Sequence, residues 1–219
     1  MLTLAFDTTS STLSTALLLD KKILTKNTIH ESGKQSELLI TEIEKILKKN
    51  KIWYQDLDLI ATSNGPGSFT GTRIGLTAAR TLKLSTNLPL ILINSCEAVA
   101  FKHRERFGEI FVLLDAGMNE FFGAKFFIEN GVTKTVLESQ LIRHEDLSEF
   151  LPKEKFFLCG SGKNLINAKN FQCEIAEKDD EIEADLIGLL ALEKFYAGWI
   201  SENLNPVYLR APRITERKK

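Results

Sequence analysis

The chain has 219 residues, of which 43% are hydrophobic, and this length and composition are those of a globular protein with a sizeable buried core. Its 28 basic and 29 acidic residues give a net charge of −1, which excludes a strong overall field for holding nucleic acid or an anionic membrane. The start lacks the pattern of a secretion signal, and no segment reaches the about 18–20 apolar residues of a membrane span, so a cytoplasmic protein without a membrane partner is expected.

The first part of the chain predicts three strands followed by a helix. Residues 2–6 alternate as a short strand, residues 12–19 form a second, and residues 23–29 form a third after a polar turn. In residues 35–49, apolar side chains recur at helical spacing with charged ones between them. That spacing predicts an amphipathic helix with one apolar stripe.

A strand, a glycine-rich loop and a second helix come next. The predicted elements are, in order, a buried strand at 57–62, a loop at 64–71, a helix at 72–84 and a strand at 89–93. Ser95 is placed to cap a further helix that runs to about residue 107.

The second half of the chain repeats the pattern of the first. Asp7 ends a strand and Ala16 follows nine residues later in the next strand; Asp115 ends the strand at 110–115 and Ala124 follows at the same separation. This repetition predicts an internal duplication, although two α/β lobes could also share the pattern by chance.

The duplication predicts two lobes with a boundary near residue 108. The N-terminal lobe is expected to cover residues 1–108 and the smaller C-terminal lobe residues 109–219. A last helix, predicted at residues 184–197, is expected to pack back on the first lobe.

Paired strand-turn-strand units, each with an acidic residue at the end of its first strand, are what a nucleotide cleft of the actin, hexokinase and Hsp70 class requires. In that arrangement backbone N–H groups and small hydroxyls approach phosphates, and the carboxylates orient Mg²⁺. Asp7, Thr8 and Ser10 fit such a turn, whereas the turn after Asp115 offers no hydroxyl and inserts the bulky Met118. We therefore predict a half-equipped cleft with Asp7, Thr8, Ser10 and Asp115 as its nucleotide-binding candidates.

The glycine loop is a weak phosphate signal. Gly65, Gly67 and Gly71 precede a helix start, but no lysine stands where a Walker A loop requires one. The alternative is a structural loop in which the glycines allow close packing between a strand and a helix.

Neither a catalytic residue nor a metal site is predicted. The histidines, His30, His103 and His144, form no ligand pair and are expected at the surface. The three cysteines are far apart, which predicts isolated buried or half-buried thiols. The acidic residues that are expected to be solvated are Asp146, Glu149, Asp179, Asp180, Glu181 and Glu183.

Two further surfaces have open interpretations. The helix at 72–84 carries small residues at Gly75, Ala78 and Ala79, which would let a partner helix approach closely, although both amphipathic helices could equally be simple core elements. The basic end is expected to be a solvated tail or a minor tRNA contact. It consists of Arg210, Arg213, Arg217, Lys218 and Lys219.

Residues 64–75, with the sequence Asn-Gly-Pro-Gly-Ser-Phe-Thr-Gly-Thr-Arg-Ile-Gly, resemble the signature of the TsaB (YeaZ) family. Residues 4–9, 115–120 and 206–210 support the resemblance, which spans nearly the whole chain. Gln35 departs from the family pattern, because a histidine often stands at that position.

The resemblance implies an ASKHA fold of two RNase H-like lobes with mixed sheets. It also implies a non-catalytic scaffold that binds and activates TsaD, the paralogue that transfers threonylcarbamoyl to adenosine 37 of tRNA, together with the small ATPase TsaE. Transfer RNA would be reached indirectly through this complex, and a homodimer would form when TsaD is absent. No cofactor would be intrinsic; ATP or ADP with Mg²⁺ would bind only in the complex with TsaD.

By the same resemblance, the helices at 35–49 and 72–84 would form a bundle with the equivalent helices of the partner. The residues expected at this partner surface are Leu38, Leu39, Ile43, Ile46, Arg73, Ile74, Gly75, Ala78, Ala79 and Leu82. Two rival functions remain: an ATP-dependent kinase or ATPase that uses the Asp7/Asp115 cleft, and a tRNA-binding module, which the charge balance disfavours.

Overall fold

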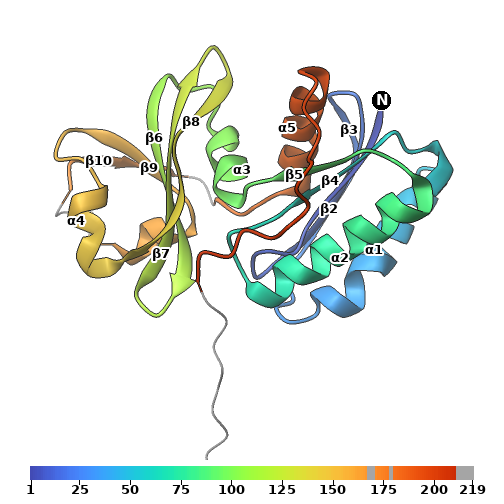
Figure 1. The fold of residues 1–219 in the computed structure, drawn as a ribbon, viewed down its shortest axis with the longest axis horizontal. Coiled ribbons are helices and arrows are strands. Elements are labelled where there is room, and N and C mark those ends of the chain that lie inside the picture. Colours follow the sequence, from blue (N-terminus) through green and yellow to red (C-terminus); the bar gives the residue numbers. More distant parts are fainter. Residues whose placement is uncertain (167–170, 178–179, 211–219) are drawn as a thin grey trace, which may run out of the picture.

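A computed structural model describes residues 1–166, 171–177 and 180–210 of the chain. Figure 1 shows two β-sheets with two helices between them, α3 (Ser95–Lys102) and α5 (Ala184–Tyr196). Of the described helices, none is both long and apolar enough to cross a membrane.

The first sheet is mixed, in the strand order β3-β2-β1-β4-β5. Its strands are β1 (Leu2–Asp7), β2 (Leu13–Leu19), β3 (Lys22–Ile29), β4 (Leu59–Ser63) and β5 (Leu90–Ile93). The first three form an antiparallel meander, whereas β4 and β5 continue parallel to β1.

The second sheet has the same topology, in the order β10-β9-β6-β7-β8. Its strands are β6 (Gly108–Gly117), β7 (Glu120–Glu129), β8 (Val132–Arg143), β9 (Phe156–Cys159) and β10 (Cys173–Ile175). Again three antiparallel strands are followed by two parallel ones. The predicted α/β class with two mixed sheets is confirmed.

Helices α1 (Gln35–Lys49) and α2 (Phe69–Thr86) lie side by side on the outer face of the first sheet (Figure 1). Alternate residues of β1, such as Leu4 and Phe6, belong to the core cluster on this side, together with Leu39 and Ile43 of α1. The period-2 pattern of the strand and the helical stripe therefore meet in one apolar layer.

A second core lies between the two sheets and is shared by them. Helix α3 packs against the second sheet, although it follows the first in sequence, and α5 packs against the first sheet, although it follows the second. Gly188 of α5 lies so close to the first sheet that an added Cβ would stand 2.5 Å from Leu18 Cδ1. The predicted boundary at residues 108 and 109 stays a prediction.

Several helix ends differ from the sequence prediction. Helix α2 begins at Phe69 rather than residue 72, because the Ser68 side chain caps it by accepting the Gly71 N–H at 3.2 Å. Asn94, not Ser95, caps α3, since its Oδ1 accepts the Cys96 N–H at 2.8 Å, and this helix ends at Lys102.

The helical segments described between residues 118 and 166 are short. They are α4 (Leu147–Phe150) and the 3₁₀ turns His144–Asp146 and Ser161–Leu165; another 3₁₀ turn, Tyr54–Asp56, lies in the first lobe. A third apolar cluster packs α4 on the outer face of the second sheet.

Candidate functional site

A cleft of ≈ 1050 Å³ opens between the two lobes. The first lobe contributes the β1–β2 turn, the start of α1 and the glycine loop, and the second contributes the end of β6 and the turn after β9. Residues 180–182 and 207–210 complete its walls. Of the four nucleotide-binding candidates, only Ser10 and Asp115 line this cleft.

Asp7 is turned into the protein and is fully buried. Its Oδ1 accepts hydrogen bonds from the hydroxyls of Thr9, at 2.7 Å, and of Ser63, and its Oδ2 accepts the Thr9 N–H at 3.1 Å. Burial raises the pKa of Asp7 above its ordinary value, although these hydrogen bonds oppose the shift. The carboxylate therefore fixes the turn and leaves no free oxygen in the cleft.

Thr8 is also buried, because the glycine loop and α2 pack directly on it. The Thr8 hydroxyl donates to the Gly71 carbonyl at 2.7 Å. An added Cβ would stand 1.9 Å from the Thr8 carbonyl oxygen at Gly71, and 2.6 Å from Thr8 Oγ1 at Gly75. Small residues here permit contact with the chain's own turn rather than with a partner.

The other two loop glycines have different roles. An added Cβ at Gly67 would stand 2.4 Å from the Thr9 carbonyl oxygen, which accepts the Ser68 N–H at 2.7 Å. Gly65 has a φ of +92°, a conformation that side chains rarely adopt.

Gln35 holds the same turn from the first residue of α1. Its side-chain amide donates to the carbonyl oxygens of Ser10, at 3.2 Å, and Ser11, at 3.3 Å. The residue is buried, so the first-lobe turn is fastened from three sides: by Asp7, by the glycine loop and by α1.

The second-lobe turn is built differently. Strand β6 does not end at Asp115 but continues to Gly117, and only residues 118–119 connect it to β7. Met118 and Asn119 both have a φ of 61°, as in a tight two-residue hairpin. Asp115 is exposed, and its Oδ1 accepts the Gly117 N–H at 2.7 Å.

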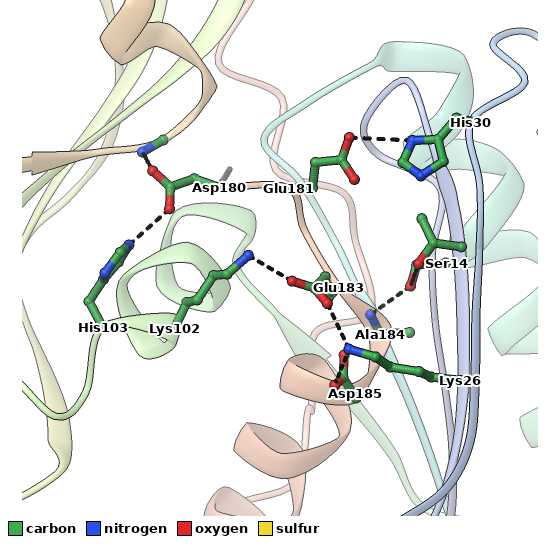
Figure 2. Close-up of polar contacts among 12 residues, drawn as sticks. Ser14, Lys26, His30, Lys102, His103, Asp180, Glu181, Glu183, Ala184 and Asp185 are labelled. Atoms are coloured by element: carbon green, nitrogen blue, oxygen red, sulfur yellow. Dashed lines mark hydrogen bonds and ion pairs between the residues drawn. The ribbon is translucent and has the colours of Figure 1, made fainter. Parts of the chain in front are cut away.

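Residues 180–185, here called the acidic crossover, pass along the cleft from the second lobe to α5. Figure 2 shows Asp180 Oδ1 beside His103 Nε2, at 2.9 Å. Asp180 Oδ2 accepts the Gly160 N–H at 2.7 Å and the Lys163 ammonium at 2.8 Å. Burial raises the pKa of Asp180, but these hydrogen bonds outweigh it and hold the pKa below its ordinary value.

Further ion pairs fasten the crossover to both lobes. Glu183 accepts hydrogen bonds from Lys102, at 2.7 Å, and Lys26, at 2.9 Å, and Lys26 also reaches Asp185 at 2.9 Å (Figure 2). Burial raises the pKa of Glu183, but the two lysines outweigh it and lower that pKa.

Three expectations about polar residues are corrected here. Asp180 is buried and Glu183 is half-buried in ion pairs, so neither is a solvated acidic residue. His103 is not at the surface, because its side chain is only 13% exposed against Asp180. The charges in the sequence do not indicate which lysines and histidines face these carboxylates. Asp179, which was also expected to be solvated, lies outside the described residues.

The C-terminal segment joins the two lobes. The Val207 N–H donates to the Asn64 carbonyl at 2.8 Å, and the Arg73 guanidinium donates to the Tyr208 hydroxyl at 2.8 Å. Arg210 donates to the carbonyl oxygens of Ala116, at 2.8 Å, and Gly117, at 3.2 Å, and pairs with Glu120.

Arg210 is therefore held against the second-lobe turn and is not part of a solvated tail. The other predicted basic residues, Arg213, Arg217, Lys218 and Lys219, lie outside the described residues.

The predicted partner surface divides into two sets. Leu39, Ile43, Ile46, Gly75 and Ala79 are buried within the chain itself, so they offer a partner little surface, and their place in an interface stays a prediction. The residues that keep exposed surface are Leu38, Arg73, Ile74, Ala78 and Leu82.

The structure also brings together three residues that sequence reasoning did not connect. His103, Cys159 and Asp180 offer a nitrogen, a sulfur and a carboxylate oxygen that all lie within 4.8 Å of one another. They come from three distant segments, so no spacing rule could have found them. Burial raises the pKa of Cys159 well above its ordinary value and that of Cys96 to about 12.

Sequence comparison finds related proteins over most of the chain. The family described as TsaD, tRNA N6-adenosine threonylcarbamoyltransferase, matches residues 23–187. The tRNA threonylcarbamoyladenosine biosynthesis protein TsaB of Bacillus subtilis is 32% identical over 155 residues, which cover 71% of this chain and 67% of that protein. TsaB of Escherichia coli is 28% identical over 94% of each chain.

Solved structures share the fold. YeaZ from Pseudomonas aeruginosa has a TM-score of 0.79 at 21% identity, covering 95% of this chain and 99% of that one. Component A of (R)-2-hydroxyglutaryl-CoA dehydratase from Acidaminococcus fermentans has a TM-score of 0.53 at 10% identity, covering 89% of this chain and 98% of that one. Both likenesses concern the fold alone, and they fit the predicted ASKHA-like fold of two lobes with mixed sheets.

Proposed function

The chain belongs to the TsaB family of tRNA threonylcarbamoyladenosine biosynthesis proteins, and from this premise we propose that it is the scaffold subunit that binds and activates TsaD. Its role in this biosynthesis follows from the family. The finer role, a subunit without catalysis of its own, is supported by the outer face of α1 and α2 and by the cleft.

The observation that carries the proposal is the low charge of the exposed face of α2. Between residues 70 and 81, its exposed positions are Thr70, Arg73, Thr77 and Thr81. Ile74, Ala78 and Arg80 are half-exposed beside them, and the Arg80 guanidinium donates to the Leu204 carbonyl. A helix face that stays in water ordinarily carries lysine and glutamate. Small and apolar residues with little charge are typical of the centre of an interface.

Arg73, the one charged residue among those exposed positions, is already engaged within the chain. Its guanidinium lies 3.8 Å from the centre of the Phe69 ring and donates to the Tyr208 hydroxyl. Leu38 of α1 and Ile74 of α2 are half-exposed and pack on the same core cluster. The two helices thus present one partly apolar ridge on which a partner helix pair could pack.

The family match to TsaD supports a partner with a similar fold. Because TsaD is similar in sequence over residues 23–187, it would offer equivalent helices, and the two chains would pair through like surfaces. The same surface would form a homodimer when TsaD is absent. TsaE and tRNA would join through this complex.

The cleft supports the absence of independent catalysis. Both carboxylate oxygens of Asp7 accept hydrogen bonds from the chain itself, and the turn after Asp115 is a short hairpin without a hydroxyl. The rival proposal, a kinase or ATPase of the Asp7/Asp115 cleft, would need a carboxylate on each side of the cleft. No nucleotide is proposed as an intrinsic cofactor; ATP or ADP with Mg²⁺ would bind only in the complex with TsaD.

Replacing Ala78 with arginine tests the interface. The half-exposed site accommodates the side chain in the free protein, but an uncompensated charge buried against TsaD would cost a few kcal/mol, roughly a hundredfold or more in affinity. Ala78→Arg is therefore expected to lose co-purification with TsaD and to lower threonylcarbamoyladenosine in tRNA.

Ala197→Arg makes the same change at an exposed position after α5 and should leave assembly unchanged. Both variants should unfold at the temperature of the original protein. Normal binding of TsaD by Ala78→Arg would refute the α1/α2 surface, and steady hydrolysis of Mg²⁺–ATP by the isolated chain would favour the kinase or ATPase instead.

A further inference from the structure

The side chains of His103, Cys159 and Asp180 converge from three separate elements beside the cleft. His103 follows the last residue of α3, Cys159 is the last residue of β9, and Asp180 belongs to the acidic crossover. Their nitrogen, sulfur and oxygen atoms lie within 4.8 Å of one another. We propose that these three residues form a binding site for a zinc ion.

The separations suit a tetrahedral ion after small movements. At zinc distances of about 2.0–2.3 Å, neighbouring ligand atoms stand roughly 3.3–3.8 Å apart. His103 Nε2 and Asp180 Oδ1 are now 2.9 Å apart, so they would separate by about half an ångström, and the sulfur would approach by about 1.3 Å at most.

The chemistry of the donors favours zinc over harder cations. An imidazole, a thiolate and a carboxylate form a mixed nitrogen, sulfur and oxygen set, whereas Mg²⁺ and Ca²⁺ prefer oxygen alone. On binding, the Cys159 thiol gives its proton to solvent, and the thiolate and carboxylate balance the two charges of the ion.

Neighbouring groups already orient the ligands. The Gly160 N–H and the Lys163 ammonium hold Asp180 Oδ2, which leaves Oδ1 directed at His103. The His103 ring packs edge to face on Phe157, with ring centres 5.1 Å apart. Such outer contacts are what metal sites use to fix their first ligands.

The ion has a path from the cleft. Asp180 and Lys163 line the cleft, although both are largely buried, and Cys159 has no exposed surface. A water molecule from the cleft supplies the fourth ligand. Zinc would thereby tie α3 and β9 to the acidic crossover, which leads into α5.

The competing interpretation is an ion-pair cluster of His103, Asp180 and Lys163 that needs no metal. Cobalt distinguishes the two, since Co²⁺ bound tetrahedrally by a thiolate gives a near-ultraviolet charge-transfer band and intense visible bands. The full chain, freed of metal by chelation, is titrated with Co²⁺ and then with Zn²⁺. We expect one equivalent of Co²⁺ to produce these bands, Zn²⁺ to abolish them and to raise the unfolding temperature.

Three variants locate the site. Cys159→Ser should lose the charge-transfer band, and His103→Gln, which keeps a donor toward Asp180, should weaken Zn²⁺ binding by more than about a hundredfold. Cys173→Ser alters a half-buried thiol and should bind both metals as the original chain does.

Absence of the cobalt bands in the original chain would overturn the proposal. So would bands that survive in His103→Gln or vanish in Cys173→Ser. His103 keeps some exposure, and glutamine at this position can still donate a hydrogen bond to Asp180. His103→Gln is therefore expected to fold, and it tests the proposal even if Cys159→Ser does not fold.

Discussion

The turn after Asp7 and the turn after Asp115 occupy the same place in two sheets of one topology, yet they are built in opposite ways. In the first lobe, residues 8–12 form a longer turn around a buried carboxylate. In the second lobe, residues 118–119 form a short hairpin beside an exposed carboxylate.

The difference shows where each turn obtains its rigidity. The first turn is held from inside, by Ser63, by Gln35 and by the glycines of the following loop and helix. The second is held from outside, by Arg210 of the C-terminal segment. Two lobes of the same topology can thus differ in the structure of the turn that each contributes to the cleft.

The largest expected loss of stability comes from a substitution at Gly71 in the first lobe, with Gly117 in the second lobe as its counterpart. Gly71→Ala would place a methyl group 1.9 Å from the Thr8 carbonyl oxygen, and should lower the free energy of unfolding by about 3 kcal/mol. Gly117→Ala meets no described atom within 4 Å and bears only the strain of φ +71°, about 1 kcal/mol. Urea denaturation measures both; equal losses would contradict the tight packing of the first turn.

The second largest difference in stability is expected between variants of the two carboxylates, Asp7 and Asp115. Asp7→Ala leaves two buried hydroxyls and one N–H without their acceptor, so a loss of about 2 kcal/mol in unfolding free energy is expected. Asp115→Ala removes an exposed acceptor and should lose about 0.5 kcal/mol. If urea denaturation finds Asp115→Ala to be the more destabilised variant, the assignment of the buried turn is wrong.

Arg210→Ala should lower the unfolding free energy by about 1 kcal/mol, because the Ala116 and Gly117 carbonyls lose their donor. Arg143 is a matched control: it is largely exposed and lies 3.6 Å from Glu145, so Arg143→Ala should change stability by less than about 0.5 kcal/mol. Thermal unfolding compares the two. Indistinguishable variants would mean that the C-terminal segment does not fasten the second turn.

A dependence on pH completes the comparison. Burial raises the pKa of Asp7, so its contribution to stability is present below the unfolded pKa and is lost as pH rises through the folded pKa. Asp7→Asn removes this titration. The unfolding free energy of Asp7→Asn relative to the original chain should therefore increase as the pH rises from the unfolded pKa of Asp7 toward its raised folded pKa.

A relative stability of Asp7→Asn that fell over the same interval would reverse the sign of the Asp7 shift. Urea denaturation at several pH values, with each variant compared to the original chain at the same pH, cancels the contributions of the other carboxylates.

Much of the fold could be predicted because local patterns report it. The repeated spacing of Asp7 and Asp115 indicated two similar sheets, and the stripe on residues 35–49 indicated an amphipathic helix. The same stripe could not tell core from partner surface, since Leu39 and Ile43 have the spacing that either role requires. Their burial appears only once α1 lies on the first sheet.

The site residues were harder to predict, because their roles depend on distant partners. Asp7 was expected in the cleft, but its orientation follows from Ser63, which is remote in sequence. Asp180 was expected in solvent because its neighbours in sequence are acidic, while its partners, His103 and Lys163, lie in other segments. Hydrophobic periodicity carries no information about such pairs.

The exchange of α3 and α5 between the sheets affects how the protein can be made on the ribosome. The shared core contains Ala5 and Leu18 from the beginning of the chain and Ile187 and Ala191 from near its end. Helix α5 therefore covers the inner face of the first sheet only after most of the chain has been synthesised. Folding lobe by lobe during translation is not available to this architecture, and separating the halves at the level of the gene would leave each with a helix that belongs to the other.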